Sequence, residues 1–178
     1  MRGRYVLALA AVFLALVSYY LIFESAEDPG LKQTQKRILL FSLAPWDVKA
    51  LRVVTFDGRE LFCERKGESW RLWKGTQTEN VQSTVEDFLT ALFTTQQIDR
   101  FAAQGQSMGD FGLDTPSHII TVTDRTDKDY QLRLGETSPT GACTYAQFAE
   151  SPDILVVGAL LEWEVQKVEP LLAASPMP

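Results

Sequence analysis

An uncharged, apolar segment near the N-terminus constrains this chain more than any other feature. The run YVLALAAVFLALVSYYLIF (Tyr5–Phe23) is long enough, as a helix, to cross about 30 Å of hydrocarbon. It is apolar on all sides, whereas a helix at the edge of a core keeps a polar face. We therefore predict a transmembrane anchor at residues 5–23. The alternative is a cleaved signal peptide, although the best cleavage site, Glu24-Ser25-Ala26, begins with a charged residue.

The charges on either side of this segment predict its orientation. Arg2 and Arg4 precede it, whereas acidic residues follow it. Because basic flanks stay in the cytoplasm, residues 1–4 are expected to be cytoplasmic and the rest of the chain to be exported. This arrangement is typical of a single-pass signal-anchor protein of the bacterial inner membrane with a periplasmic C-terminal domain.

The composition of the exported part argues against two kinds of partner. Without Arg2 and Arg4, 15 of the 17 Lys and Arg residues remain against 23 Asp and Glu residues, which gives a formal charge of −8. Nucleic-acid binding needs a basic surface that displaces counterions, and attachment to an anionic lipid surface needs a polybasic segment. The exported part has about 150 residues, which is the size of one ordinary domain.

The chain after the anchor divides into a linker, a domain and a tail. Residues 24–36 contain Pro29-Gly30 and little that packs, which is typical of a stalk. The domain is expected at 37–172 and a disordered tail at 173–178. Alternating and helical apolar spacings predict the elements of the domain. Strands are expected at 48–56, 59–66, 70–74, 117–124, 130–134, 142–148 and 154–157, and helices over 81–92 and 160–168.

These elements predict an α+β fold class. We expect an N-terminal transmembrane helix followed by one exported domain, in which antiparallel β-hairpins form a meander and two helices pack on it. The dipeptide Asp57-Gly58 is the clearest hairpin signal, because a two-residue turn of the favoured hand needs positive φ angles.

The stretch GDFGLDTP (109–116) contains the Asp-Phe-Gly of protein kinases. A kinase also needs a His-Arg-Asp catalytic loop and a strand lysine. The sole histidine, His118, is followed by Ile119, and no Val-Ala-Ile-Lys strand precedes the motif. The kinase interpretation is therefore excluded.

A local structural role explains the same stretch. Gly112 suits the left-handed residue that ends a helical turn, and Leu113 would fold back on that turn as its apolar contact. Asp114 is placed to hydrogen-bond the turning backbone, and Pro116 forces the preceding residue into an extended conformation. We predict a helix stop that leads into a strand.

Other short motifs do not carry chemistry. The loop Gly135–Gly141 resembles a phosphate loop, but its glycines are one residue too far apart and the Lys-Ser/Thr pair is missing. The acidic turn Asp124–Asp129 lacks the glycine and the distal Glu of a calcium loop, and its two basic residues would oppose a cation. Cys63, His118 and Cys143 would give a metal site only if folding brought all three together. We predict no catalytic residue, no cofactor and no metal site.

The cysteines and tryptophans leave alternatives open. A disulfide between Cys63 and Cys143 is permitted in an exported domain, and two buried apolar side chains are the other interpretation. Trp46 and Trp73 are candidates for exposed contacts with a partner, because aromatic anchors dominate protein interfaces. The alternative is that they cover the sheet.

The order of the motifs resembles the domain-of-unknown-function 4340 family. After the anchor come PWDVKALRV, ESWRLWKG, a helix, DFGLDTP, LRLGETSPTG and a strand with a tyrosine. The positions that match the family are Trp70, Gly112, Leu113, Asp114, Pro116, Gly135 and Tyr145. The resemblance covers roughly residues 48–168 and implies structural roles for these positions. Members are typically membrane-anchored and encoded beside ABC-transporter permeases and gliding-motility proteins, which implies an accessory role here.

Two functions from different classes fit these observations, and a third ranks below them. The first is a non-enzymatic, membrane-anchored periplasmic accessory or binding module beside an ABC-type transporter, with a membrane protein such as the permease as its partner. The second is a structural protein of the cell envelope that associates with itself. An enzyme that uses His118 ranks last, because a single histidine leaves one base for any nucleophile.

Overall fold

The computed structural model describes residues 12–19, 38–103 and 105–173. By its internal contacts the chain forms two compact units, residues 1–37 and residues 38–178. In the first unit, residues 12–19 form a helix whose side chains are mostly exposed.

The structure does not support the transmembrane helix that we included in the predicted fold class. Among the described residues, no helix has both the length and the apolar character needed to cross a membrane. The remainder of the predicted anchor, the N-terminus at 1–4 and the stalk at 24–36 lie outside the described residues.

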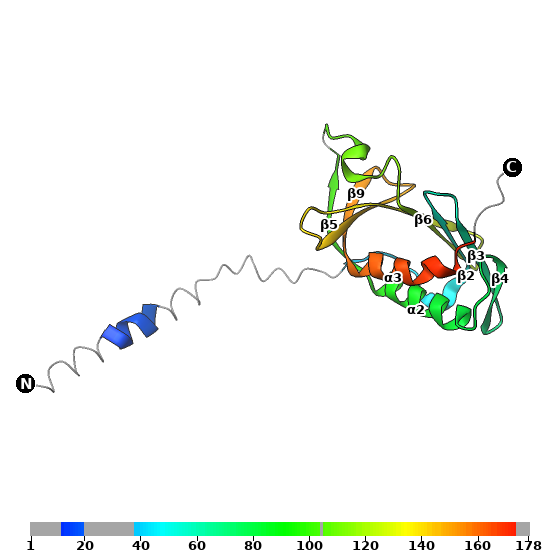
Figure 1. Cartoon of the computed structure of the whole chain (residues 1–178). Helices are drawn as coiled ribbons and strands as arrows, with labels where there is room; N and C mark the ends of the chain where they lie inside the picture. Colours follow the sequence, from blue (N-terminus) through cyan, green and yellow to red (C-terminus); the bar gives the residue numbers. More distant parts are fainter. Residues whose placement is uncertain (1–11, 20–37, 104, 174–178) are drawn as a thin grey trace, which may run out of the picture. The chain divides into compact units, whose positions relative to one another are not determined.

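The second unit is built on one large antiparallel sheet (Figure 1). Its nine strands are arranged in the order β1-β5-β9-β8-β7-β6-β2-β3-β4. Their bounds are β1 Ile38–Leu39, β2 Val48–Thr55, β3 Glu60–Lys66, β4 Ser69–Lys74, β5 Gln96–Ala102, β6 His118–Asp124, β7 Asp129–Thr137, β8 Cys143–Phe148 and β9 Asp153–Gly158.

This sheet corrects the predicted meander of hairpins in two ways. The pairing of β2 with β6 joins the first three long strands to the later ones, so a single sheet runs through the whole unit. β5 and β1, which the sequence pattern does not predict, extend the sheet beyond β9. Apolar alternation is weak in β5, because most of its side chains are exposed or half-buried, and this explains why the pattern missed it.

Two α-helices cover one face of the sheet, as predicted. They are α2 (Val81–Thr94) and α3 (Leu160–Val168), which contact each other and lie side by side in Figure 1. Their apolar stripes bury Phe88, Leu92 and Leu161 against the sheet. On the sheet side the same core contains Leu51, Leu61, Ile120 and Leu132. The predicted core role of the helix at 81–92 is therefore confirmed.

The second face carries a smaller apolar cluster near β9. The short 3-10 helix η2 (Met108–Phe111) places Phe111 and the following Leu113 against Ile154. Gly112 has a φ of 67° and ends η2, and the Leu113 amide donates to the Met108 carbonyl at 3.0 Å. The predicted helix stop is confirmed. The side chains that accept hydrogen bonds from the turning backbone are those of Asp110 and Ser107, however, rather than that of Asp114.

The segment after α3 returns to the sheet. After α3, the 3-10 helix η3 (Glu169–Leu171) leads to Ala173, whose amide and carbonyl both pair with Glu60. Residue 173 is therefore part of the domain, while 174–178 lie outside the described residues. This bridge holds Ala173 against β3.

Candidate functional site

Trp46 is an exposed aromatic residue that lines a cavity. This residue lies in the 3-10 helix η1 (Pro45–Asp47), just before β2. Pro45 favours such a start because its φ angle is fixed near the helical value. The turn closes through the Asp47 amide, which donates to the Ala44 carbonyl at 2.9 Å. The Trp46 residue is 66% exposed, so its indole is presented to solvent.

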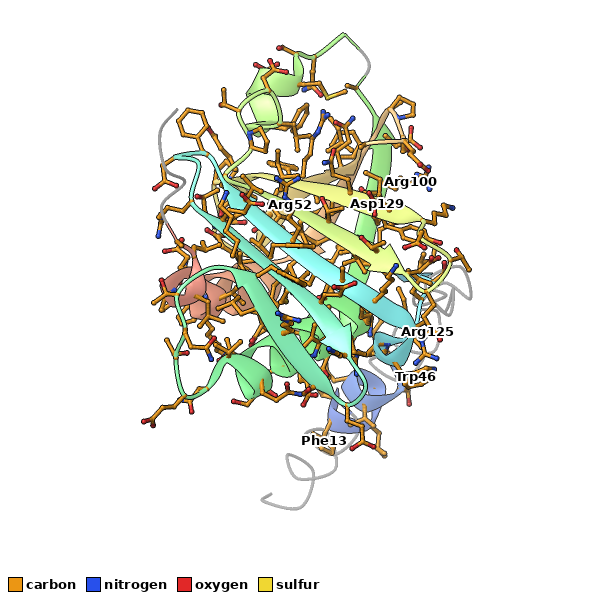
Figure 2. All side chains as sticks on the ribbon, turned by 90° about the vertical axis from the view of Figure 1, so that its right-hand side faces the viewer. Phe13, Trp46, Arg52, Arg100, Arg125 and Asp129 are labelled. Atoms are coloured by element: carbon orange, nitrogen blue, oxygen red, sulfur yellow. The ribbon has the colours of Figure 1, made fainter. Side chains whose placement is uncertain are left out.

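Two arginines hold this turn in place. Nη2 of Arg65, near the end of β3, donates to the Pro45 carbonyl at 3.3 Å. Nη2 of Arg125, in the turn between β6 and β7, donates to the Trp46 carbonyl at 2.8 Å, and its backbone amide donates to the Asp47 carbonyl at 3.1 Å. Figure 2 shows Trp46 and Arg125 beside each other. We call Pro45, Trp46, Arg65 and Arg125 the Trp46 corner.

A cavity lies on each side of Arg65. The first, which we call the helix cavity, has a volume of about 250 Å³ and separates η1 from α2. Its lining residues are Pro45, Trp46, Arg65, Glu86, Leu89 and Thr90. The second, which we call the basic cavity, has a volume of about 240 Å³ and is lined by Val48, Lys49, Arg65, Gly67 and Arg125. Trp46 therefore stands beside a pocket with three basic side chains.

The charges of the basic cavity are only partly compensated. Lys49 pairs with Asp127, and the hydrogen bond from this pair raises the pKa of Lys49. Neither Arg65 nor Arg125 forms an ion pair with any residue that the structure describes. The guanidinium of Arg65 instead lies over the Trp70 ring at 4.6 Å, and its Nε is buried without a hydrogen-bond acceptor. The site therefore has unsatisfied positive charge.

Trp73 and Trp163 are exposed to a similar degree but lie in other surroundings. Trp73 is 54% exposed on β4, where Arg71 covers its ring at 4.2 Å and its Nε1 donates to Glu64 at 3.1 Å. Trp163 is 67% exposed on α3. The Trp73 ring and its Nε1 are thus already in contact with Arg71 and Glu64 of the same domain. Of the two tryptophans predicted to contact a partner protein, Trp46 is therefore better placed to do so. Their role in binding stays a prediction.

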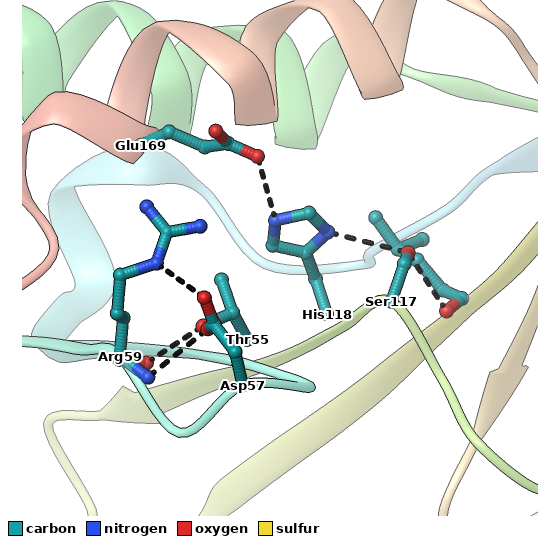
Figure 3. Close-up of polar contacts among 7 residues, drawn as sticks. Thr55, Asp57, Arg59, Ser117, His118 and Glu169 are labelled. Atoms are coloured by element: carbon teal, nitrogen blue, oxygen red, sulfur yellow. Dashed lines mark hydrogen bonds and ion pairs between the residues drawn. The ribbon is translucent and has the colours of Figure 1, made fainter. Parts of the chain in front are cut away.

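The single histidine lies in a different corner, which Figure 3 shows. Its Nε2 is 3.6 Å from a carboxylate oxygen of Glu169, and its Nδ1 is 3.2 Å from the Ser117 hydroxyl. Burial lowers the pKa of His118, and the nearby Glu169 carboxylate opposes that shift. We call Ser117, His118 and Glu169 the His118 corner.

Serine, histidine and glutamate together resemble the parts of a nucleophilic triad, but their contacts do not fit one. The Ser117 hydroxyl donates to the Leu134 carbonyl at 3.2 Å, so its proton is directed at the backbone rather than at the imidazole. None of the three residues lines either cavity of the Trp46 corner. The His118 corner ties η3 to the start of β6, which is a structural role.

The two cysteines are free and lie on strands that are not neighbours. Cys63 is fully buried in β3, where its thiol contacts the Leu51 carbonyl at 3.7 Å and burial raises its pKa to about 12. Cys143 is half-buried in β8, and three strands separate β8 from β3 in the sheet. Of the two interpretations of the cysteines, the structure supports a buried apolar side chain for Cys63. Within the described part of the chain, Cys63, His118 and Cys143 do not gather into a metal-binding cluster.

Four of the positions named in the family resemblance, Gly112, Leu113, Gly135 and Tyr145, lie around the buried Phe111. Phe111 contacts the ring of Tyr145 edge to face at 5.0 Å. A Cβ on Gly135 would lie 2.1 Å from the Phe111 carbonyl, and a Cβ on Gly112 would lie 2.7 Å from the Glu136 amide nitrogen. The two glycines thus let η2 and β7 meet backbone to backbone. Trp70 lies apart, buried under Arg65.

Sequence reasoning missed Lys49, Arg65 and Arg125 as members of one site. They lie in β2, in β3 and in the β6–β7 turn, and the pairing of β2 with both β3 and β6 brings them together. The only local signal was Pro45-Trp46, which predicts a turn with an aromatic side chain. Nothing in the spacing of the three basic residues reveals that they share a cavity.

Comparison with known proteins assigns part of this chain to a family. Residues 99–167 match the model of the Domain of unknown function (DUF4340). The match confirms the resemblance to that family, and it contains Arg125 and the positions around Phe111. No curated protein matches the chain, and no solved structure matches it.

Proposed function

We propose that this protein is a non-enzymatic accessory or binding module that acts by contact, with Trp46 as its anchor. One observation carries the proposal: two arginines fix the carbonyls of a turn whose tryptophan is exposed. An aromatic side chain on a rigid turn loses little conformational freedom on binding, and buried tryptophans are among the strongest contacts at interfaces. The helix cavity beside Trp46 offers a recess for a side chain of the partner.

The partner that we propose is a membrane protein, such as the permease of an ABC-type transporter. The support is the family resemblance, which is an argument by analogy. The basic residues before the apolar N-terminal segment also favour export of the domain. A reporter enzyme that is active only outside the cytoplasm, fused after residue 178, tests this location. Activity of the fusion supports it, and activity of a matched cytoplasm-specific reporter contradicts it.

Co-purification tests the contact. The tagged full chain is extracted from its native membrane in mild detergent, and the co-purifying proteins are identified by mass spectrometry. We expect a near-stoichiometric partner that Trp46→Ala loses. Trp163→Ala is the matched control, because Trp163 has the same exposure on another element, and it should keep the partner. A partner retained in full by Trp46→Ala, or no partner at all, would refute the proposal.

Self-association is the second candidate, and the position of β4 favours it. β4 is an edge strand, so one side of its backbone faces no other strand of the sheet, although its Trp70 amide donates to the Gln82 side chain at 2.7 Å. In that case the full chain in detergent would sediment as a dimer or larger species as its concentration rises. A strict monomer at high concentration excludes it.

A further inference from the structure

We propose that the basic cavity binds a phosphate group. This site is separate from the contact assigned to Trp46 and does not depend on a partner protein. Its cationic residues are Lys49, Arg65 and Arg125, which reach the cavity from three different elements. The chain as a whole is acidic, with a formal charge of −6, so a cavity with three basic side chains is a local exception.

The backbone of η1 holds two of these positive charges together. Arg65 and Arg125 donate to the carbonyls of Pro45 and Trp46, which are consecutive in the chain. Like charges held close to each other repel, and the repulsion grows where water is partly excluded. Asp127 pairs with Lys49, and the Glu64 carboxylate also acts on it. Arg65 and Arg125 have no ion-pair partner in the described part of the chain, so the cavity keeps an excess of positive charge. A phosphate monoester carries nearly two negative charges at neutral pH, whereas a carboxylate carries one.

The donors of the two arginines suit such a group. Each guanidinium has five N–H groups in a planar fork, which binds phosphate oxygens in pairs. The hydrogen bonds to η1 occupy Nη2 of each side chain. Nε of Arg65 is buried and has no acceptor in the described part of the chain, so the protein's own polar atoms leave this nitrogen unsatisfied. A cavity of about 240 Å³ has room for a phosphate group and a small substituent.

Equilibrium dialysis of the full chain with radiolabelled inorganic phosphate tests the site. The buffer is free of phosphate and the detergent has an uncharged sugar headgroup. We expect saturable binding to one site. Lys49→Gln and Arg125→Gln should each weaken it roughly tenfold or more, since each removes a charged hydrogen-bond donor. The matched controls Arg71→Gln and Lys128→Gln remove cations that lie over Trp73 and Tyr130, and they should bind as the wild type does.

Competition separates the two sources of a phosphate group. Displacement of the label by glycerol 3-phosphate alone identifies a soluble ester as the ligand. Displacement by a short-chain phosphatidylglycerol at lower concentration identifies a lipid headgroup. Thermal unfolding of each variant shows that it is folded. Lys49→Gln is the safer substitution of the two, because Arg125 also holds the carbonyls of η1. No saturable binding to the wild type, or equal binding to the Lys49→Gln variant, would overturn the proposal.

One further variant keeps this site apart from the proposed partner contact. Trp46→Ala should bind phosphate as the wild type does, because the arginines hold the backbone carbonyl of Trp46 and not its side chain. A loss of phosphate binding in Trp46→Ala would contradict a separate anion site.

Discussion

The part of the domain that matches the family model and the part before it differ in what their side chains do. In residues 99–167, Leu113 and Tyr145 pack around Phe111, and Gly112 and Gly135 let two segments of backbone touch. In residues 38–98, Trp46 is exposed and Arg65 keeps an unpaired charge beside two cavities. Arg125 is the one member of the Trp46 corner that lies inside the matched region.

This difference shows what the family match reports. The matched region contains the close contact between η2 and β7. Close packing of this kind leaves little freedom in the choice of residues. Most of the Trp46 corner lies outside that region, so the match by itself says nothing about its ligand. A substitution around Phe111 should therefore destabilise the fold, whereas one in the Trp46 corner should alter binding.

Gly135→Ala should have the largest effect on stability. Its Cβ would lie 2.1 Å from the Phe111 carbonyl, which is backbone and cannot rotate away. We expect the free energy of unfolding to fall by about 3 kcal/mol, measured by urea denaturation. Gly158→Ala is the control, because its Cβ would meet only the Ile98 side chain, at 4.0 Å, and it should change stability little. Equal stability of the two variants would contradict the close packing of η2 on β7.

Glu60→Gln should have the next largest effect, in the region before the match. Glu60 is almost fully buried and forms ion pairs with Arg52 and Lys74. We expect a loss of about 2 kcal/mol, since the substitution leaves two cations without their carboxylate. The exposed Glu68→Gln is the control.

The pH dependence of this loss provides a second check. Burial by itself would raise the pKa of Glu60, but the hydrogen bonds from Lys74 and Arg52 outweigh it, so the pKa lies below 4.5. Its stabilising contribution is therefore present above pH 4.5 and is lost as the pH falls through the lowered pKa. The stabilities of wild type and Glu60→Gln should converge in acid. A constant difference would contradict the ion pairs.

The His118 corner should give a smaller, pH-dependent effect. Because burial lowers the pKa of His118 below 6.5, the unfolded chain binds its proton more readily than the folded chain. Stability should therefore decrease as the pH falls through 6.5 toward the lowered pKa, and it should level off above 6.5. Urea denaturation at several pH values measures this slope, which His118→Gln should reduce. An unchanged slope would show that His118 does not titrate on unfolding.

Trp46→Ala should change stability least. The indole is mostly exposed and the hydrogen bonds at this position involve backbone atoms. We expect the free energy of unfolding to change by no more than about 0.5 kcal/mol. A larger loss would show that Trp46 packs as the buried residues do, which would remove the distinction between the Trp46 corner and the matched region.

Much of the secondary structure could be predicted from local pattern. The apolar spacing of α2 and the helix stop at Gly112 are local features, and both are present. A hairpin turn does lie at Asp57-Gly58, but it is longer than the predicted two-residue turn: the Thr55 amide donates to the Arg59 carbonyl, and Gly58 has a positive φ whereas Asp57 does not. The prediction of a transmembrane helix is not supported, because no helix among the described residues is long and apolar enough to cross a membrane. An apolar run indicates only the length that a helix could reach. β5 was missed because its side chains do not alternate between a buried and an exposed face.

The sequence by itself determined most of the helices and strands of the domain, the acidic balance and the family-model match of residues 99–167. Only the tertiary structure decided that β2 lies between β3 and β6, and this pairing assembles the Trp46 corner from residues up to 80 positions apart. The physical reason is that backbone hydrogen bonds between strands are the same for every sequence. Which strands become neighbours, and which charges then share a cavity, depends on how the whole core packs.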